Sequence, residues 1–161
     1  AVADQTILAG ANGASVTLSM LDELIDAIAD GADAIMMRSG TARAVRALLR
    51  ASGGLEPAHV MMENFGRPML THNGVPIIVN DFLANNETKG SGTNLASIYA
   101  MRLNEVDGLH GIYSGATAGV TIKELGSLET KDAERTRLKW YCGLALKSTN
   151  SLARIEGVTN S

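Results

Sequence analysis

Apolar and polar positions alternate along residues 135–147, RTRLKWYCGLALK. The even-numbered positions are mostly apolar, whereas the odd-numbered ones begin with three basic residues, Arg135, Arg137 and Lys139. This period of two predicts an unusually long β-strand, which would span about 43 Å at about 3.3 Å per residue. We therefore expect the apolar side of the strand, centred on Trp140, to be buried against another element.

An earlier segment follows the helical period instead. Thr17 or Ser19 can cap the start of a helix there, and Gly31 can end it. The apolar positions of this segment recur at i, i+3, i+4 and i+7, and they are Leu21, Leu24, Ile25 and Ile28. The spacing predicts an amphipathic helix with an acidic outer face.

A second helix is expected after Ser39-Gly40-Thr41, which forms a turn and cap, and it extends to about Ala51. Gly53 and Gly54 can close it. Its apolar stripe consists of Val45, Leu48 and Leu49. A row of arginines follows another side, and its members are Arg43, Arg46 and Arg50. This row is either a solvated face or a contact for a phosphate or a partner.

The remaining predicted elements are strands. Ala34–Met37 is expected as a short buried strand, and Asn73-Gly74 as a tight turn before a strand at residues 76–79. Residues 85–94, NNETKGSGTN, are expected to form a polar, mobile loop. Shorter strands are expected at residues 98–103, 109–113 and 120–125.

Length and composition suit a soluble globular protein with one domain, or one domain carrying a subdomain. Of the 161 residues, 45% are hydrophobic, but no apolar run is long enough to span a membrane. The start, AVADQTILAG, lacks the basic residues of a signal peptide, so we expect a cytosolic origin. The single cysteine, Cys142, excludes an internal disulfide and is expected to be a buried apolar residue rather than a reactive thiol.

Charge is distributed unevenly, although the net charge is only −3. The first 33 residues hold six acids and no Lys or Arg, so the rest, with 14 basic and 11 acidic residues, carries +3. Either solvation of an amphipathic helix explains this asymmetry, or complementary surfaces meet between copies of the chain. A dedicated nucleic-acid binder would be more basic.

No motif predicts a catalytic, cofactor or metal site. Gly90-Ser91-Gly92 lacks the third glycine and the following helix of a dinucleotide site, and Lys147-Ser148 follows a predicted strand rather than a phosphate-binding loop. The three histidines have no spacing that indicates metal binding, and they are His59, His72 and His110. We therefore expect no enzyme activity, no cofactor and no bound metal.

Three phrases carry a resemblance to a known family: DAIMM at residues 33–37, GVPIIV at 74–79, and an Arg-x-x-Trp-Tyr-x-Gly-Leu-Ala cadence in the long strand. The residues that match this cadence are Arg137, Trp140, Tyr141, Gly143, Leu144 and Ala145. In order and spacing these phrases, with the amphipathic helix before them, resemble the tailed-bacteriophage major capsid proteins of the Hong Kong 97 type. The resemblance covers most of residues 17–158.

This resemblance implies an α+β fold in which a spine helix packs on a long-stranded antiparallel sheet, with a central mixed α/β axial domain. The implied peripheral domain comprises residues 17–65 and 116–150, and the axial domain residues 66–115 and 151–161. Residues 1–16 would be a linker or a truncated N-terminal region. The strand residues Leu138, Trp140 and Leu144 would then be buried against the first helix. The family's N-terminal arm and extended loop are missing, so we expect a fragment or trimmed product.

The resemblance implies a major capsid protein, a non-catalytic subunit that self-assembles through pentameric and hexameric capsomers into an icosahedral head shell. It implies location in the virion after assembly in the host cytoplasm, enclosure of double-stranded DNA without sequence-specific binding, and no membrane contact. Scaffold, portal or decoration proteins are further expected partners. An encapsulin-like compartment shell, with a cargo enzyme in place of DNA, is the alternative. A small α/β enzyme is a third possibility and would need a cleft with convergent titratable groups.

Overall fold

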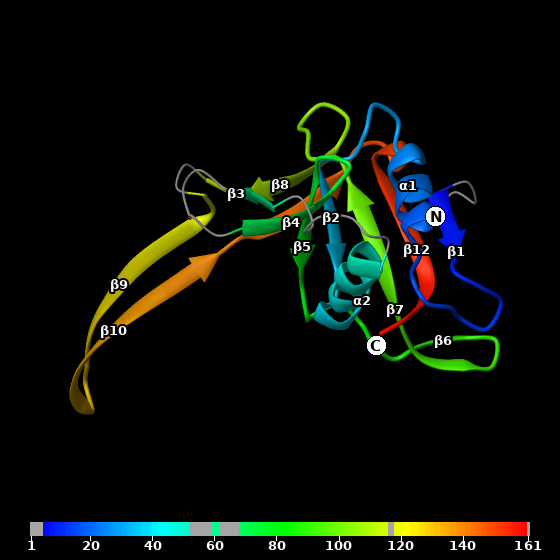
Figure 1. Ribbon diagram of the computed structural model, residues 1–161. Helices are drawn as coiled ribbons and strands as arrows, with labels where there is room; N and C mark the ends of the chain where they lie inside the picture. Colours follow the sequence, from blue (N-terminus) through cyan, green and yellow to red (C-terminus); the bar gives the residue numbers. More distant parts are fainter. Residues whose placement is uncertain (1–4, 52–58, 62–67, 116–117, 161) are drawn as a thin grey trace. The chain divides into compact units, whose positions relative to one another are not determined.

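The protein divides into two units in a computed structural model that describes residues 5–51, 59–61, 68–115 and 118–160 (Figure 1). Unit 1 comprises Ala1–Leu109 and Lys147–Ser161, and unit 2 comprises His110–Leu146. The predicted peripheral domain, residues 17–65 with 116–150, takes parts of both units.

Unit 1 is built on a mixed β-sheet. Its strands are β1 (Thr6–Leu8), β2 (Ala34–Met37), β3 (His59–Met61), β4 (Pro68–His72), β5 (Val75–Val79), β6 (Glu87–Lys89), β7 (Gly92–Met101) and β12 (Leu152–Thr159). Their order is β1-β12-β7-β2-β5-β4-β3, and β6 pairs with β7. The pairs β1–β12 and β2–β5 are parallel, whereas the other pairs are antiparallel. A short 3-10 helix, Thr149–Ser151, precedes β12.

Helix α1 (Leu18–Asp26) starts where the sequence predicts. The Thr17 hydroxyl oxygen accepts a hydrogen bond from the Met20 backbone N–H at 3.2 Å, which makes Thr17 the N-cap. The helix ends at its C-cap, Ala27, and not at the predicted Gly31. A turn separates these two positions, and it contains Asp30 with a positive φ of 66°.

Helix α2 (Ser39–Ala51) starts earlier than predicted, because Ser39, Gly40 and Thr41 are its first residues and not a turn before it. A distant loop supplies the cap. The Asp81 carboxylate accepts a hydrogen bond from the Ser39 backbone N–H at 3.0 Å. Hydrogen bonds from Ser39 lower the pKa of the Asp81 carboxyl below its usual value. The predicted stop at Gly53 and Gly54 lies outside the described residues.

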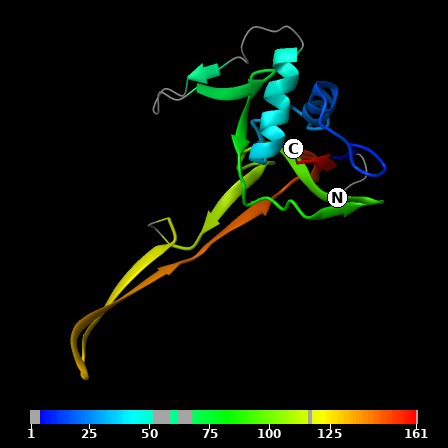
Figure 2. The same ribbon diagram turned by 60° about the horizontal axis from the view of Figure 1, so that its bottom comes forward.

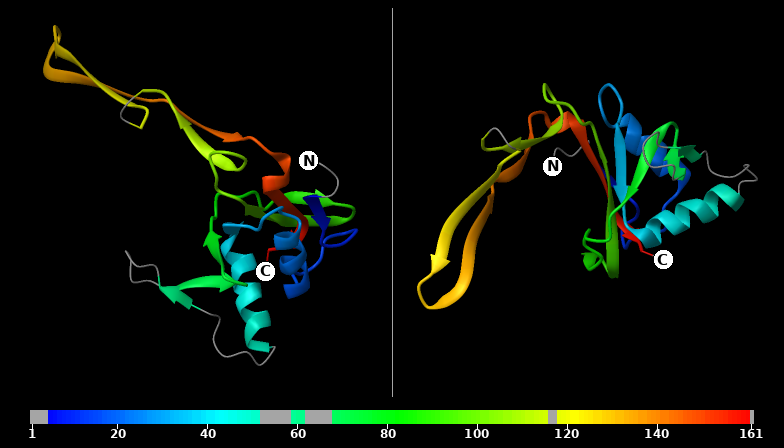
Figure 3. Two further views of the ribbon diagram at one scale, coloured as in Figure 1. Left: turned by 90° about the horizontal axis from the view of Figure 1, so that it is seen from above. Right: turned by 90° about the vertical axis from the view of Figure 1, so that its left-hand side faces the viewer.

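Both helices lie on one face of the sheet, and the core of unit 1 is packed between them and the strands (Figure 3, right). Leu21 and Leu24 of α1 are fully buried there, together with Ile35 of β2, Ile98 of β7 and Ile155 of β12. The prediction that the apolar face of α1 covers the long strand is therefore wrong, because this face belongs to the core of unit 1.

Two chain reversals in unit 1 test the expectations about turns. Asn73 and Gly74 adopt positive φ values of 49° and 82° between β4 and β5, which confirms the predicted tight turn. Residues 85–94, in contrast, are not a loop, because β6 and the start of β7 pair within them. Gly92 is required there, since a Cβ atom on it would lie 1.9 Å from the backbone oxygen of Asn12.

A charged network holds β6 against the sheet. The Glu87 carboxylate lies 3.1 Å from the Arg154 guanidinium and accepts a hydrogen bond from the Ser97 hydroxyl at 2.6 Å. Lys89 forms an ion pair with Glu156. These contacts join β6, β7 and β12, so Glu87–Lys89 is part of the sheet and not of a polar loop.

Unit 2 consists of two separate pairs of hydrogen-bonded strands. Strands β9 (Val120–Leu128) and β10 (Lys131–Trp140) form a long, twisted two-stranded ribbon (Figure 2), and β11 (Cys142–Leu146) pairs with β8 (Leu109–Tyr113). The predicted long strand at residues 135–147 is thus two strands, interrupted at Tyr141. The Tyr141 backbone N–H donates to the Gly119 carbonyl at 3.0 Å, which fixes the chain at this break.

Candidate interaction surface

The β9–β10 ribbon exposes both of its faces. Every residue of β10 is exposed, and so is every residue of β9 except Leu128. Leu138, Trp140 and Leu144 are 67%, 66% and 77% exposed, so the prediction that they are buried against a helix is wrong. Two strands make a single layer, and a single layer cannot bury a face without a covering element.

The hydrogen-bond register sorts the side chains of the ribbon into two faces. Leu138 lies opposite Ile122, and Trp140 lies opposite Val120, which makes one face apolar. Arg137 lies opposite Lys123 and Lys139 lies opposite Thr121, so the other face is basic. The predicted alternation is confirmed, whereas the predicted burial is not.

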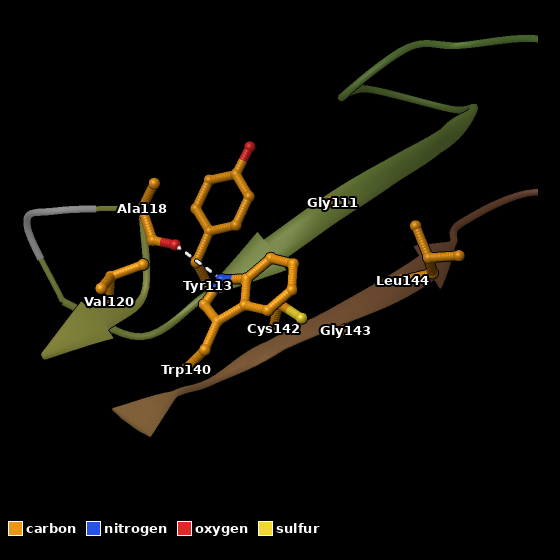
Figure 4. Close-up of a pocket in the computed structure, with 8 residues that line it drawn as sticks. All are labelled: Gly111, Tyr113, Ala118, Val120, Trp140, Cys142, Gly143 and Leu144. Carbon is orange, nitrogen blue, oxygen red and sulfur yellow. Dashed lines mark hydrogen bonds between the residues drawn. The ribbon is translucent and has the colours of Figure 1, made fainter. Parts of the chain in front are cut away.

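The apolar face continues into an open groove of about 650 Å³. Its lining comes from β8, β11 and the adjoining ends of β9 and β10, and it consists of Gly111, Tyr113, Ala118, Val120, Trp140, Cys142, Gly143 and Leu144 (Figure 4). The Trp140 indole N–H donates to the Ala118 carbonyl at 3.2 Å, which fixes the ring while one face stays open. Cys142 is exposed in this groove, so its predicted burial is wrong.

The chemistry of this groove favours apolar contact. Only Tyr113 and Cys142 among its lining residues carry a titratable side chain. Burial of one large apolar side chain contributes about 1.5–3 kcal/mol, and several such side chains are exposed side by side here. Large exposed apolar patches of this kind are typical of protein or membrane interaction sites and of ligand-binding grooves.

The residues considered as motif candidates have structural roles in unit 1. Gly90-Ser91-Gly92 forms the β6–β7 turn, and the Ser91 backbone N–H donates to the Asn12 side chain at 3.1 Å. His72 is buried, with its Nε2 atom 2.7 Å from the Asp22 carboxylate. The side chain of His59 lies outside the description.

Within residues 5–51, 59–61, 68–115 and 118–160, no group of three or more His, Cys, Asp or Glu side chains is placed to hold a metal ion. No helix within the same ranges is long and apolar enough to cross a membrane.

Comparison with solved structures identifies a protein of the same fold. The chain is similar to a chain in the cryo-electron microscopy structure of the holo-SrpI encapsulin complex from Synechococcus elongatus PCC 7942. The TM-score is 0.80 and the sequence identity 22%; the match covers 99% of this chain and 55% of that chain, so this chain spans about half of its length. No protein-family model matches the sequence, and no curated protein matches it significantly. The two chains therefore share a sheet-dominated α/β fold over the matched region.

Proposed function

We infer that this protein is a structural subunit of a self-assembling protein shell of the encapsulin kind. The observation that carries this proposal is the similarity of almost the whole chain, at a TM-score of 0.80, to a chain of an encapsulin complex. The exposed apolar face of the ribbon supports it independently, because a shell subunit needs surfaces that only neighbouring subunits cover.

The proposal gives the chain a mechanical role and no catalytic one. Its groove lining is almost wholly apolar, which suits packing between subunits. Many copies of a weak contact give a stable closed assembly, since each contact raises the effective concentration of the next. The proposal also places this shell in the cytoplasm as a compartment and not in a virus particle as its head.

The encapsulin interpretation is preferred to the phage head that the sequence resemblance implies. The solved structure of similar fold belongs to an encapsulin complex, and it covers the chain nearly from end to end. The phage interpretation depends on short phrases in the sequence. Enclosed material separates the two functions: a phage head holds DNA, whereas a compartment shell holds protein.

Electron microscopy of the purified protein tests the proposal. We expect closed particles of uniform diameter, with an absorbance spectrum typical of protein alone. Particles rich in DNA would favour the phage head instead. A protein that stays monomeric at all concentrations, with the ribbon intact by circular dichroism, would contradict a shell function.

A further inference from the structure

The basic face of the β9–β10 ribbon consists of exposed cationic side chains. Arg137 of β10 lies directly opposite Lys123 of β9, and Lys139 follows Arg137 on the same side of the strand. Arg135 lies two residues before Arg137 in β10, where the strand pairing is irregular, so the register assigns only Lys123, Arg137 and Lys139 to this face. These three residues are exposed, so the ribbon carries a cluster of cations.

This cluster works against the stability of the ribbon itself. Like charges that lie directly opposite each other on paired strands are destabilising. None of the ion pairs found among the described residues involves Lys123, Arg137 or Lys139. Folding of the isolated ribbon therefore does not explain these cations, whereas an anionic partner does.

Unit 1 carries a matching anionic surface on the outer face of α1. Glu23 and Asp26 are exposed, and they lie three positions apart, which places them on the same side of the helix. Neither forms an ion pair within the described residues. Their neighbour Asp22 is different, because it is occupied by His72 and Asn73.

The two surfaces also match in net charge and in spacing. Unit 2 holds five basic and four acidic residues, so its net charge is +1. Since the whole chain has a net charge of −3, the net charge of unit 1 is −4. Helix neighbours three positions apart have Cβ atoms about 5–6 Å apart. Strand neighbours two positions apart are separated by about 6.6 Å, so two ion pairs can form side by side.

We propose that the basic face of the ribbon, Lys123, Arg137 and Lys139, binds the acidic outer face of α1, centred on Glu23 and Asp26, in a second copy of this chain. The inference rests on the proposed shell function and names the partner of its ribbon. The two patches differ, so the contact is heterologous, and heterologous contacts build rings or open chains. It leaves the apolar face, on the other side of the ribbon, for a different neighbour.

Two charge-reversal variants of the full chain test this contact. Variant A carries Glu23→Lys and Asp26→Lys, and variant B carries Arg137→Glu and Lys139→Glu. Self-association is measured by sedimentation velocity at about 0.05 M and about 0.5 M NaCl, which changes the screening length roughly threefold. For the wild type we expect association that weakens with salt. For A alone and B alone we expect association at least about tenfold weaker at low salt.

An equimolar mixture of A and B is the decisive sample. The native basic face of A meets the native acidic face of B, and the two reversed faces meet each other, so we expect association to return to within about threefold of the wild type. No return in the mixture overturns the proposal. Rescue only when all four substitutions are in one chain would place the contact within a chain, and that result also overturns it.

Matched controls separate this contact from net charge and from folding. Glu105→Lys and Arg46→Glu change exposed charges elsewhere in unit 1, and we expect the salt dependence of association to be unchanged. Circular dichroism of A and B checks that both fold. A short DNA duplex is added as the competing anion. If Arg137→Glu abolishes DNA binding, and the mixture of A and B does not regain self-association, then the basic face binds nucleic acid and the proposal is overturned.

The outcomes also distinguish this contact from the proposed function. If closed particles form equally well with both charge reversals, the shell function stands and the proposed contact is overturned. If charge-dependent pairing occurs without closed particles, the contact stands and the shell function is overturned. A wild-type chain that shows no self-association at low salt would overturn both.

Discussion

The indole Nε1 of Trp140 donates a hydrogen bond to the carbonyl oxygen of Ala118 at 3.2 Å, while the Trp140 residue remains 66% exposed. The side chain is therefore held in place without being buried. A fixed aromatic ring on an open surface loses little side-chain entropy when a partner covers it. This arrangement fits a residue that acts in association rather than in the core.

Trp140→Ala should consequently affect association more than folding. We expect the free energy of unfolding to fall by about 1 kcal/mol, the net value of one hydrogen bond, and not by the roughly 3–5 kcal/mol of a buried tryptophan. Urea unfolding followed by circular dichroism gives this value. Trp140→Phe is the control, because it keeps the apolar ring and removes the N–H. A loss of 3 kcal/mol or more in Trp140→Ala, by the buried-core estimate, would show that a covering element buries the ring.

Adjacent residues of β5 give a matched test of the core. Ile77 is 4% exposed and faces the helices, whereas Ile78 is 37% exposed and faces the other side of the sheet. We expect Ile77→Ala to cost about 2–5 kcal/mol of unfolding free energy, and Ile78→Ala about 1 kcal/mol or less. Denaturant midpoints of the two variants check this. Equal costs would indicate that both faces of the sheet are covered.

The sequence predicts those elements of the fold that local chemistry determines. The Thr17 cap and the Asn73-Gly74 turn each depend on a few neighbouring residues, and both are where they were expected. The prediction of the strand Ala34–Met37 is also confirmed, because a short apolar run before a helix is a clear signal. The strand β6 within residues 85–94 is not predicted from the sequence, because it depends on pairing with β7. The turn that follows β6 depends in addition on a contact with Asn12, which lies in a distant loop.

The candidate surface could be predicted only in part. Alternation correctly assigned Leu138 and Trp140 to one face and Arg137 to the other. It could not reveal what covers the apolar face, because period two describes which side chains share a side and says nothing about a neighbour. The signal that was overlooked lies in β9, where Val120 and Ile122 repeat the same alternation and so predict a two-sided ribbon.

Asp22 should contribute to stability far more than its neighbour Glu23. The Asp22 carboxylate accepts a hydrogen bond from the Asn73 side chain at 2.7 Å and lies 2.7 Å from Nε2 of the buried His72. Asp22→Ala leaves this buried imidazole nitrogen without its partner, so we expect a loss of about 1–3 kcal/mol. Glu23→Ala should change the free energy of unfolding by less than about 0.5 kcal/mol. Thermal unfolding of dilute samples, in which the chain is monomeric, compares the two, and a larger effect at Glu23 would contradict the assignment.

Glu156 predicts a specific dependence of stability on pH. The hydrogen bond from Lys89 lowers the pKa of the Glu156 carboxyl, and the charges of Lys89 and Arg154 act in the same direction, whereas burial opposes them. The folded state therefore binds a proton on Glu156 less readily than the unfolded state does. This contribution to stability is complete above the unfolded pKa of about 4.3 and is lost as the pH falls through the lower folded value.

Glu156→Gln should therefore lower the free energy of unfolding by about 1 kcal/mol at neutral pH, a value at the upper end for a partly exposed pair. The difference from the wild type should shrink below about pH 4.3, because the wild-type carboxyl is then protonated as well. Urea unfolding at a series of pH values measures it. Glu105→Gln is the control, since Glu105 is exposed and belongs to none of the ion pairs found among the described residues. A deficit in Glu156→Gln that stays constant down to acid pH would mean that the ion pair with Lys89 does not stabilise the attachment of β6 to the sheet.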